Sequence, residues 1–301
     1  MKGIITHNGK FHADDVFAVA TLELAHPDEK FDVRRTRDKG EIAAGDFVVD
    51  VGGEYDGKKF FDHHQSGGAG IRENGIPYAS FGLVWKEFGA VICGGDFFVQ
   101  KQIDDSLVAS LDANDNGVKI SEEIYPVSHF DIGSFIAAHN LTWLEEEELG
   151  EAAEAKRLEI FLTLVNFAKD LITRSIKRHK DKNLAYQLVK DIYEKSEDKR
   201  IIVLEKYMPS EDALMEFSEP VFVVYPQSDN KGWVAKTISK AKNSFESRLP
   251  FPISWAGKMD SDLQSVTGVP DALFCHNKRF LAVAGSKDGA IKLSELALNT
   301  K

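Results

Sequence analysis

The sequence predicts an α/β protein with a mostly parallel N-terminal sheet, a helical bridge and a smaller α+β domain at its C-terminal end. Three observations predict this fold class. Short apolar runs alternate with helical patterns over residues 1–115, a charged helical segment follows, and two hairpin patterns occur in the last third of the chain. We expect the corresponding domains at residues 1–142, 143–199 and 200–301.

Four short apolar runs predict the strands of the N-terminal domain, over residues 2–6, 31–37, 46–51 and 59–61. Three helices are predicted over residues 14–25, 78–88 and 97–111. The pair His26-Pro27 ends the first helix, and Gly89 ends the second. Strands that alternate with helices through short links favour parallel pairing, with helices on both faces of the sheet.

The rest of the chain changes from one long helical pattern to short strands. Residues 143–197 are heavily charged and carry apolar side chains at helical spacing, so they predict the bridge. We interpret its acidic and basic runs as solvent-exposed helix faces. Strands are then predicted over residues 200–204, 220–225, 232–238, 272–276 and 280–284, with a closing helix over residues 290–298.

Composition and charge exclude several classes of protein. The net charge of -11 lies entirely in the first 200 residues and argues against a broad nucleic-acid-binding face. No apolar run approaches the roughly 20 residues of a membrane span. Cys93 and Cys275 lack the spacing of a metal site, and no secretory or transit pattern precedes the first strand. We expect a cytoplasmic protein with no membrane partner; a homodimer is left open.

Residue types that bind metal ions follow three of the predicted strands. His7 follows the first strand, Asp50 the third, and Asp62-His63 the fourth. In open α/β sheets ligands bind beyond the carboxyl ends of the strands, so these side chains are expected at one edge. A lone Asp such as Asp50 has an ordinary alternative, because it also suits the cap of a turn.

Two further segments supply histidines, acids and amides. The segment from His7 to Asp15 holds two His and two Asp at a strand-to-helix junction, with a turn and N-capping acids as the alternative. The segment from Asp112 to Gly117 lies in or beside a turn, with a plain Asx-rich loop as the alternative. Mixed His and Asp ligands suit Mn, Fe or Zn better than Mg or Ca. A pair of divalent ions about 3.5–4 Å apart activates water for attack on a phosphoester.

Taken together, these motifs resemble one family over nearly the whole chain. Further matching segments are Phe61-Asp62-His63-His64-Gln65, residues 80–85, Arg248-Leu249-Pro250, Ser254-Trp255-Ala256-Gly257, Gly268-Val269-Pro270 and Phe274-Cys275-His276. The chain resembles the Myg (melanocyte proliferating gene) family of the DHH phosphoesterase superfamily. The resemblance implies a DHH-type catalytic domain followed by a substrate-binding domain, and a 3'-5' exonuclease activity on RNA. The family also carries an older label, metal-dependent protein hydrolase.

The resemblance implies two divalent metal ions, with Mn²⁺ favoured and Mg²⁺, Zn²⁺ or Fe²⁺ as alternatives. The implied ligands are His7, His12, Asp14, Asp50, His63 and Asp112. Asp50 matches the acid that bridges the two ions, and Asp115 is the alternative to Asp112. His12 stands where the wider superfamily usually has an acid, so this ligand set is less anionic.

Catalytic roles are implied for two neighbours of the ligand His63. Asp62 is expected to orient His63, and His64 is expected to lie nearer the substrate. A hydroxide held between the ions would attack phosphorus, with His64 donating to the leaving or a non-bridging oxygen.

Phosphate contacts are predicted for four residues of the C-terminal domain, namely Arg248, His276, Lys236 and Lys287. An Arg before a proline-containing turn is able to clamp a phosphate bidentately. An exposed Arg or a satisfied hairpin His is the alternative in each case. The glycine-rich substrate loop of related superfamily members is represented only by residues 284–289, which is a departure from their pattern.

Three functions follow, in order of preference. The first is a two-metal phosphodiesterase acting as a 3'-5' exonuclease on RNA or short oligonucleotides. The second keeps the metals but cleaves a small phosphoanhydride, a cyclic dinucleotide or an amide bond, and the acidic net charge favours such small substrates. The third is a non-catalytic regulator that binds metal or nucleotide.

Overall fold

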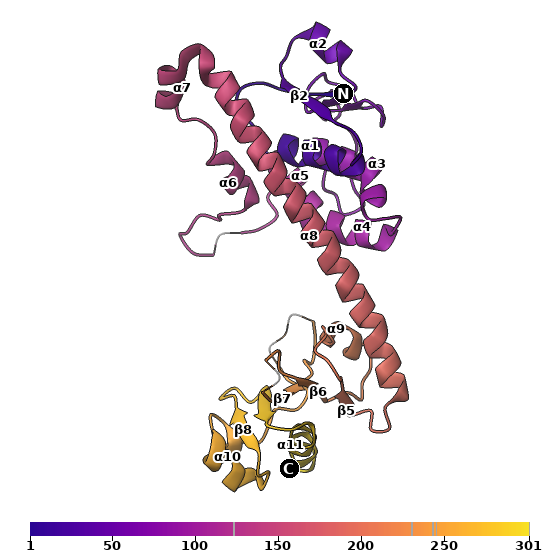
Figure 1. The fold of residues 1–301 in the computed structure, drawn as a ribbon, viewed down its shortest axis with the longest axis vertical. Helices are drawn as coiled ribbons and strands as arrows, with labels where there is room; N and C mark the ends of the chain where they lie inside the picture. Colours follow the sequence, from indigo (N-terminus) through magenta and orange to yellow (C-terminus); the bar gives the residue numbers. More distant parts are fainter. Residues whose placement is uncertain (123, 230, 243, 245, 301) are drawn as a thin grey trace. The chain divides into compact units, whose positions relative to one another are not determined.

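The computed structural model describes residues 1–122, 124–229, 231–242, 244 and 246–300 (Figure 1). Its contacts divide the chain into two compact units, Met1–His179 and Lys180–Lys301. The division falls inside the long helix α8 (Ala153–Lys195), so each unit includes part of the segment predicted as a bridge. The predicted domain boundaries at 142/143 and 199/200 stay predictions.

The first unit is built on a four-stranded parallel sheet in the order β2-β1-β3-β4. Its strands are β1 (Lys2–Thr6), β2 (Phe31–Arg35), β3 (Phe47–Val49) and β4 (Phe60–Phe61). The predicted α/β class and all four predicted strands are confirmed. Every residue of β3 is buried, as expected for a parallel strand covered on both faces.

The helices of the first unit are α1 (Ala13–Ala25), α2 (Lys39–Ala44), α3 (Ser80–Ile92), α4 (Phe97–Ile103), the π-helical turn η1 (Asp104–Val108), α5 (Ala109–Asp115), α6 (Ile132–Ala137), α7 (Trp143–Leu149), the 3₁₀ turn η2 (Gly150–Ala152) and α8. The sequence did not predict α2 or α6, which are six residues each. Short helices of this kind carry too few apolar positions to show a helical period.

Two predicted helix ends are wrong. Helix α3 continues past Gly89 to Ile92 because this glycine allows close packing: a Cβ there would lie 2.8 Å from the Trp85 ring. The helix predicted over residues 97–111 is divided into α4, η1 and α5 and reaches Asp115. Asp112 is therefore in a helix, whereas the sequence predicted it in or beside a turn.

One apolar core holds the first unit together. It joins the fully buried α1 side chain Phe17 to Phe81 of α3, with ring centroids 5.3 Å apart. The N-terminal half of α8, which runs past α1 in Figure 1, adds Phe161 to this core. The core fixes the start of α1 and the start of α3 relative to the sheet edge, and both helix starts contribute to the site described below.

The second unit contains a five-stranded mixed sheet in the order β5-β6-β7-β9-β8, in which only β5 and β6 pair in parallel. Its strands are β5 (Ile201–Val203), β6 (Phe222–Pro226), β7 (Trp233–Thr237), β8 (Ala272–Cys275) and β9 (Leu281–Ala284). Both predicted hairpins are confirmed, because β6 pairs antiparallel with β7 and β8 with β9.

The helical elements of the second unit are α9 (Glu211–Leu214), the 3₁₀ turn η3 (Ile253–Trp255), α10 (Asp260–Thr267) and α11 (Lys287–Asn299). The sequence predicted only α11, and placed its start three residues too late. Ser286 caps this helix, since its hydroxyl oxygen accepts the N–H of Gly289 at 3.0 Å.

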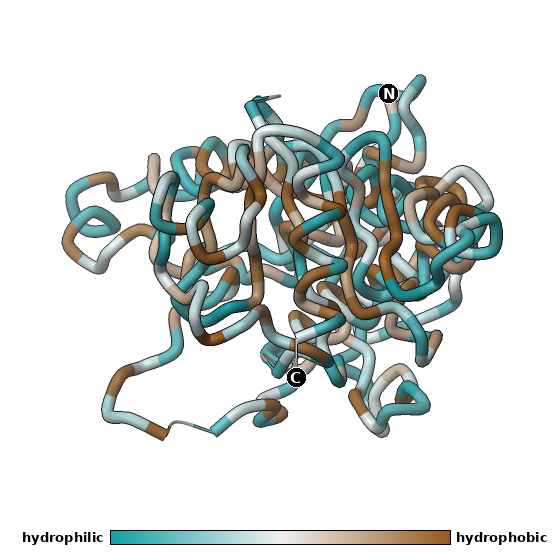
Figure 2. The backbone as a smooth tube through the Cα atoms, turned by 90° about the horizontal axis from the view of Figure 1, so that it is seen from below, coloured by the Kyte–Doolittle hydropathy of each residue, from teal (hydrophilic) through white to brown (hydrophobic). Residues whose placement is uncertain are grey.

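Hydrophobic and hydrophilic residues alternate at short intervals along the backbone in Figure 2. Over the part of the chain that the structure describes, no helix combines the length and the apolar character that crossing a membrane requires.

Candidate metal centre

The carboxyl edge of the parallel sheet brings together residues from five segments. His7 follows β1, Asp50 follows β3 and His63 follows β4. The start of α1 contributes Asp14, and the end of α5 contributes Asp115. The spatial grouping expected from the strand ends is therefore present in the structure, and it includes both helix termini.

Asp50 occupies the centre of this cluster. One carboxylate oxygen, Oδ2, lies 3.3 Å from Nε2 of His7, and the other, Oδ1, lies 3.4 Å from Nε2 of His63. Its backbone φ of 58° is left-handed, a region that Asp enters more readily than most residues. The N–H of Asp50 donates to the carbonyl of Phe61 at 3.1 Å, which ties this backbone to the next strand. The geometry allows one carboxylate to serve two ligand groups.

Asp14 is held by the first turn of α3. Its two carboxylate oxygens accept the backbone N–H groups of Ser80 and Phe81 at 2.8 and 2.7 Å. The hydroxyl of Ser80 donates to Oδ1 of Asp50 at 3.1 Å. A helix N-terminus favours anions through its free N–H groups and its dipole, so this turn positions two buried carboxylates.

Asp115, and not Asp112, approaches the histidine cluster. Oδ2 of Asp115 lies 3.1 Å from Nε2 of His63. Oδ2 of Asp112 lies 2.7 Å from Nη1 of the buried Arg72, and its Oδ1 accepts the N–H of Gly82 at 3.0 Å. Arg72 also pairs with Asp104 at 2.9 Å. Asp112 is thus ion-paired with Arg72, and within the described residues it belongs to no group of candidate ligand atoms.

Asp62 contacts His64, whereas the sequence predicted that it orients His63. Its Oδ1 accepts Nδ1–H of His64 at 2.7 Å and the backbone N–H of the same residue at 3.1 Å. Its Oδ2 accepts the N–H of Gly53 at 2.5 Å. The His64 side chain is 63% exposed, so a buried acid fixes an imidazole that stays accessible to a substrate.

The carboxylates of Asp14, Asp15 and Asp50 lie close together, so positive charge beside them stabilises their ionised forms. Burial, reinforced by the charges of Asp50 and Asp115, raises the pKa of Asp14 well above its usual value. Burial raises the pKa of Asp15 to about 7, although His7 opposes this effect. Burial also disfavours the charged form of Asp50, but the two histidines beside it outweigh burial and lower its pKa.

The histidines take up protons in response. Burial lowers the pKa of His63, but the carboxylates of Asp115 and Asp50 outweigh burial and raise it to about 11. The pKa of His7 is likewise raised, by Asp50 and Asp15 against the effect of burial. Protons on these rings supply the positive charge that the carboxylates require, and bound cations would supply it equally.

The donor set fits metal binding. Ligand atoms within 4.8 Å of one another form three groups: His7, His12 and Asp50; Asp50, His63 and His64; and Asp14, His63 and Asp115. Two ligand atoms that bind one ion at about 2.1 Å lie about 3.0–3.4 Å apart, as several pairs here do. The buried Nε2 of His63 lies 3.1 Å from Asp115 and 3.4 Å from Asp50, and the buried Oδ2 of Asp15 lies 3.3 Å from Nε2 of His7, so these atoms face other members of the cluster.

Three contributors were missed by sequence reasoning. Asp15 lies 3.3 Å from Nε2 of His7, Ser80 binds Asp50, and Arg72 engages Asp112. Asp15 stands next to Asp14, and Ser80 lies in the segment 80–85 that resembles the family, but the sequence assigned no role to either residue. Nothing in the sequence around Arg72 marks it, because its partners are more than thirty positions away.

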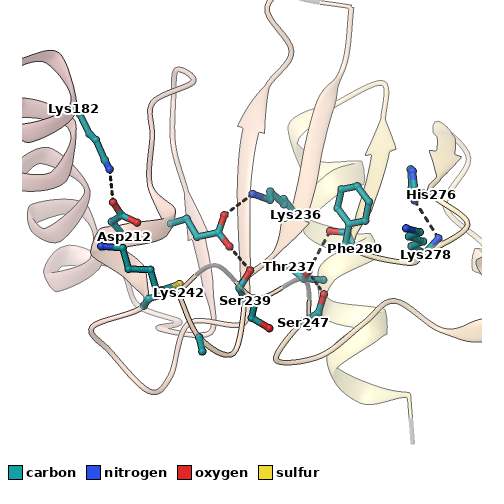
Figure 3. Close-up of a pocket in the computed structure, with 14 residues that line it drawn as sticks. Lys182, Asp212, Lys236, Thr237, Ser239, Lys242, Ser247, His276, Lys278 and Phe280 are labelled. Carbon is teal, nitrogen blue, oxygen red and sulfur yellow. Dashed lines mark hydrogen bonds and ion pairs between the residues drawn. The ribbon is translucent and has the colours of Figure 1, made fainter. Parts of the chain in front are cut away.

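The second unit contains the four predicted phosphate contacts. Lys236 and His276 line a cavity beside β7 and the β8–β9 hairpin, where Lys236 pairs with Glu211 at 2.7 Å (Figure 3). The Arg248 guanidinium does not line this cavity and donates to the carbonyls of Pro220 and Met215 at 2.8 and 3.2 Å. Lys287 pairs with Glu205 outside the lining. The substrate roles of all four stay predictions.

Comparisons with known proteins agree with the motifs. The model of the family MYG1_exonuc, described as "Uncharacterised protein family (UPF0160)", matches residues 3–298. The MYG1 protein of Chlamydia muridarum is 31% identical over 314 residues, which cover 99% of this chain and 96% of the relative. The human protein named MYG1 exonuclease is 30% identical over 328 residues, which cover 97% of this chain and 85% of the relative.

A pGpG-specific phosphodiesterase from Vibrio, PggH, aligns over 99% of both chains with 11% identity and a TM-score of 0.26, a likeness too slight to support an argument. The family match spans almost the whole chain, and the motifs at the sheet edge lie within it. The chain belongs to the MYG1 family.

Proposed function

We propose that this chain is a phosphodiesterase that uses two divalent metal ions, Mn²⁺ by preference, and removes nucleotides from RNA or short oligonucleotides in the 3'-to-5' direction. The observation that carries the proposal is the buried Asp50 carboxylate, which belongs to one ligand group with His7 and His12 and to another with His63 and His64. The name exonuclease given to the human relative supports the same class of reaction.

Asp50 belongs to two ligand groups, and each group would hold one ion. His7 and His12 lie on one side of it, and His63 lies on the other. Asp14 and Asp115 complete the His63 side. Asp115 therefore replaces Asp112 in our assignment, because Asp112 is bound to Arg72 and belongs to none of these groups within the described residues.

Two divalent ions held by these residues would lower the pKa of water and would neutralise charge on a phosphoryl oxygen. The protein's own contribution is to hold the ligands rigidly. The first turn of α3 fixes Asp14 through two N–H groups, and the Ser80 hydroxyl fixes Asp50. Preorganised ligands need little rearrangement when charge develops in the transition state.

His64 is the residue placed to move a proton. Its Nδ1–H donates to the buried Asp62, which fixes the orientation of the ring, and its exposed position leaves Nε2 accessible. In the proposed reaction Nε2–H donates its proton to the leaving oxygen, which is the 3' oxygen of the shortened strand. General acid catalysis of this kind contributes about 10²–10⁴-fold to a rate.

The overall charge favours short substrates. With a net charge of -11 the chain repels a long polyanion, and the C-terminal third, residues 201–301, is neutral by comparison. We therefore expect oligonucleotides of a few residues to be better substrates than long RNA.

The test is the release of mononucleotides from an oligoribonucleotide labelled at its 5' end. With Mn²⁺ the wild type is expected to shorten the labelled strand one nucleotide at a time, and Asp50→Asn and His63→Ala are expected to abolish shortening. Asn is chosen at position 50 because it tolerates the left-handed backbone and isolates the loss of charge.

The opposite outcome is equally clear. No shortening by the wild type, or equal shortening by the two variants, contradicts the proposal. A panel that includes pyrophosphate, a cyclic dinucleotide and a peptide amide then identifies which other bond the centre cleaves. Metal uptake without turnover on the whole panel identifies a binding protein.

A further inference from the structure

The turn between β1 and α1, residues 8–11, separates the two histidines of one ligand group. His7 precedes the turn and His12 follows it, and both belong to a ligand group with Asp50. Within the part of the chain that the structure describes, residues 8–11 make no hydrogen bond to another backbone group. Backbone donors and acceptors that leave water need partners, so this turn depends on side chains from other elements.

Asn140, which follows helix α6, binds the backbone of Phe11. Its Oδ1 accepts the N–H of Phe11 at 3.0 Å, and its Nδ2–H donates to the carbonyl of Phe11 at 2.9 Å. Two hydrogen bonds from one amide fix the peptide units on both sides of Phe11. The second of these units leads directly to His12, whose own N–H donates to Oδ1 of Asp15 at 2.9 Å.

Arg35, the last residue of β2, holds the same turn at Gly9. Strands β1 and β2 pair in parallel with Thr6 opposite Arg35, so both strands end at one edge of the sheet. The Nη2–H of Arg35 donates to the carbonyl of Gly9 at 2.9 Å. Its guanidinium carbon lies 5.4 Å from the ring centre of the buried Phe11 and 5.0 Å from that of Phe161 on α8. A guanidinium at these distances is attracted to both rings, which ties the turn to the core.

We propose that Asn140 and Arg35 are positioning residues that fix His12 for the metal ion it would share with His7 and Asp50. His12 requires this support because it is exposed, whereas His7 and Asp50 are buried. A ligand on a fixed backbone loses less conformational freedom when it binds an ion. The inference rests on the metal binding of the proposed function and adds two residues that lie outside its ligand groups.

The test is a titration of the full-length chain with Mn²⁺ in the absence of RNA, which gives the number and affinity of the sites. Asn140→Ala and Arg35→Gln are each expected to weaken one ion about tenfold or more, the same ion that His12→Ala weakens, because outer partners orient the ligand. The ion on the His63 side is expected to stay within a few-fold of wild type, which also shows that the variants fold. Unchanged affinities, or an equal loss of both ions, overturn the proposal.

Two matched controls are available in the same unit. Asn166→Ala on α8 removes an exposed amide that donates to the carbonyl of Leu162 in its own helix. Arg34→Gln changes the neighbour of Arg35 in β2, which pairs with Asp32 at the surface. Both controls are expected to retain both ions. A control that weakens the same ion as strongly as its matched variant overturns the proposal.

A double variant tests whether Asn140 acts through His12. In a chain that already carries His12→Ala, we expect Asn140→Ala to cause no further loss of Mn²⁺ affinity, since residues that act as one unit have non-additive effects. The full tenfold loss in that chain would show an action independent of His12 and would overturn the proposal.

Hydrogen exchange of the metal-free chain in EDTA tests the turn itself. Asn140→Ala and Arg35→Gln are expected to speed up amide exchange over residues 8–12, because each removes a side-chain bond to this backbone. Exchange equal to that of wild type in both variants would show that these side chains do not hold the turn.

These results are separable from turnover. Selective loss of the His12 ion in the variants, together with no nuclease activity of the wild type, supports the positioning role and contradicts the proposed function. Shortening of the labelled strand by the wild type, together with both ions retained in the two variants, supports the function and contradicts the positioning role.

Discussion

Oδ2 of Asp112 lies 2.7 Å from Nη1 of Arg72, and both side chains are buried. This ion pair gives Asp112 a structural partner, while Asp115 lies 3.1 Å from His63. A metal ligand and an ion-paired acid respond differently to loss of charge, so the two positions are separable by experiment.

The first prediction compares Asp115→Asn with Asp112→Asn. We expect Asp115→Asn to weaken binding of the second Mn²⁺ ion about 10-fold or more, because a carboxylate ligand is lost. Asp112→Asn is expected to retain both ions. Isothermal titration with Mn²⁺ measures the number and affinity of sites. If only the Asp112 variant loses an ion, Asp112 and not Asp115 is the ligand.

The second prediction concerns the stability of the Arg72 network. Arg72→Met leaves the buried carboxylate of Asp112 unpaired at pH 8, above its pKa of about 7, and removing one partner of a buried ion pair costs about 3–5 kcal/mol of unfolding free energy. The control is Arg34→Met, since Arg34 pairs with Asp32 and Glu41 at the surface, where a pair contributes about 1 kcal/mol or less. Urea denaturation measures both, and similar losses would contradict the assignment.

The third prediction uses the pH dependence of stability. Burial raises the pKa of Asp112 in the folded state to about 7. In the unfolded chain the same carboxyl group has its ordinary pKa near 4, so between these two pH values only the folded state keeps the proton. The contribution of Asp112 to stability is therefore complete below about pH 4 and is lost as the pH rises through about 7.

Asp112→Asn removes this titration. The difference in unfolding free energy between wild type and variant, measured by urea denaturation without metal from pH 4 to 8, is expected to shift in favour of the variant as the pH rises. A difference that is constant over this range would show that Asp112 does not titrate there.

The fourth prediction concerns Ser80, whose hydroxyl donates to Asp50 at 3.1 Å. Ser80→Ala removes a charge-assisted hydrogen bond worth about 1.5–3 kcal/mol, so we expect Mn²⁺ affinity to fall about tenfold. Ser106→Ala is the matched control, because its exposed hydroxyl only donates to the carbonyl of Gln102. Titration of both variants with Mn²⁺ checks this prediction. Equal affinities of the two variants would show that Ser80 does not position Asp50.

The fifth prediction assigns the proton donor. His64→Gln is expected to lower kcat about 100-fold while KM and Mn²⁺ affinity stay within a few-fold of wild type. His139→Gln is the control, since it is an exposed histidine of the same unit that follows α6 and whose ring contacts Phe135 of that helix. If Mn²⁺ affinity falls together with kcat in the His64 variant, His64 is a metal ligand and not the proton donor.

The strand positions were predictable because their apolar runs are short, strongly hydrophobic and bounded by turn residues. The same reasoning placed His7, Asp50 and His63 at one sheet edge, since strand polarity alone determines where strand ends meet. The positions of these residues in the structure agree with that expectation, and their roles as ligands stay a proposal.

Other features depend on contacts that the sequence does not show. Asp112 and Asp115 are three positions apart in the same helix, α5, and their environments differ because the distant Arg72 pairs with Asp112 whereas Asp115 lies beside His63. Arg248 looked like a phosphate clamp, yet its guanidinium binds backbone carbonyls of its own unit. Long-range partners of this kind carry no local pattern.

The most direct measurement of the central claim is the electron paramagnetic resonance spectrum of the chain with two equivalents of Mn²⁺. If Asp50 is shared by two ions, the wild type will show an exchange-coupled manganese signal, and Asp50→Asn will show only isolated ions or none. A wild-type spectrum of isolated Mn²⁺ alone, or a coupled signal that persists in the variant, would contradict the account.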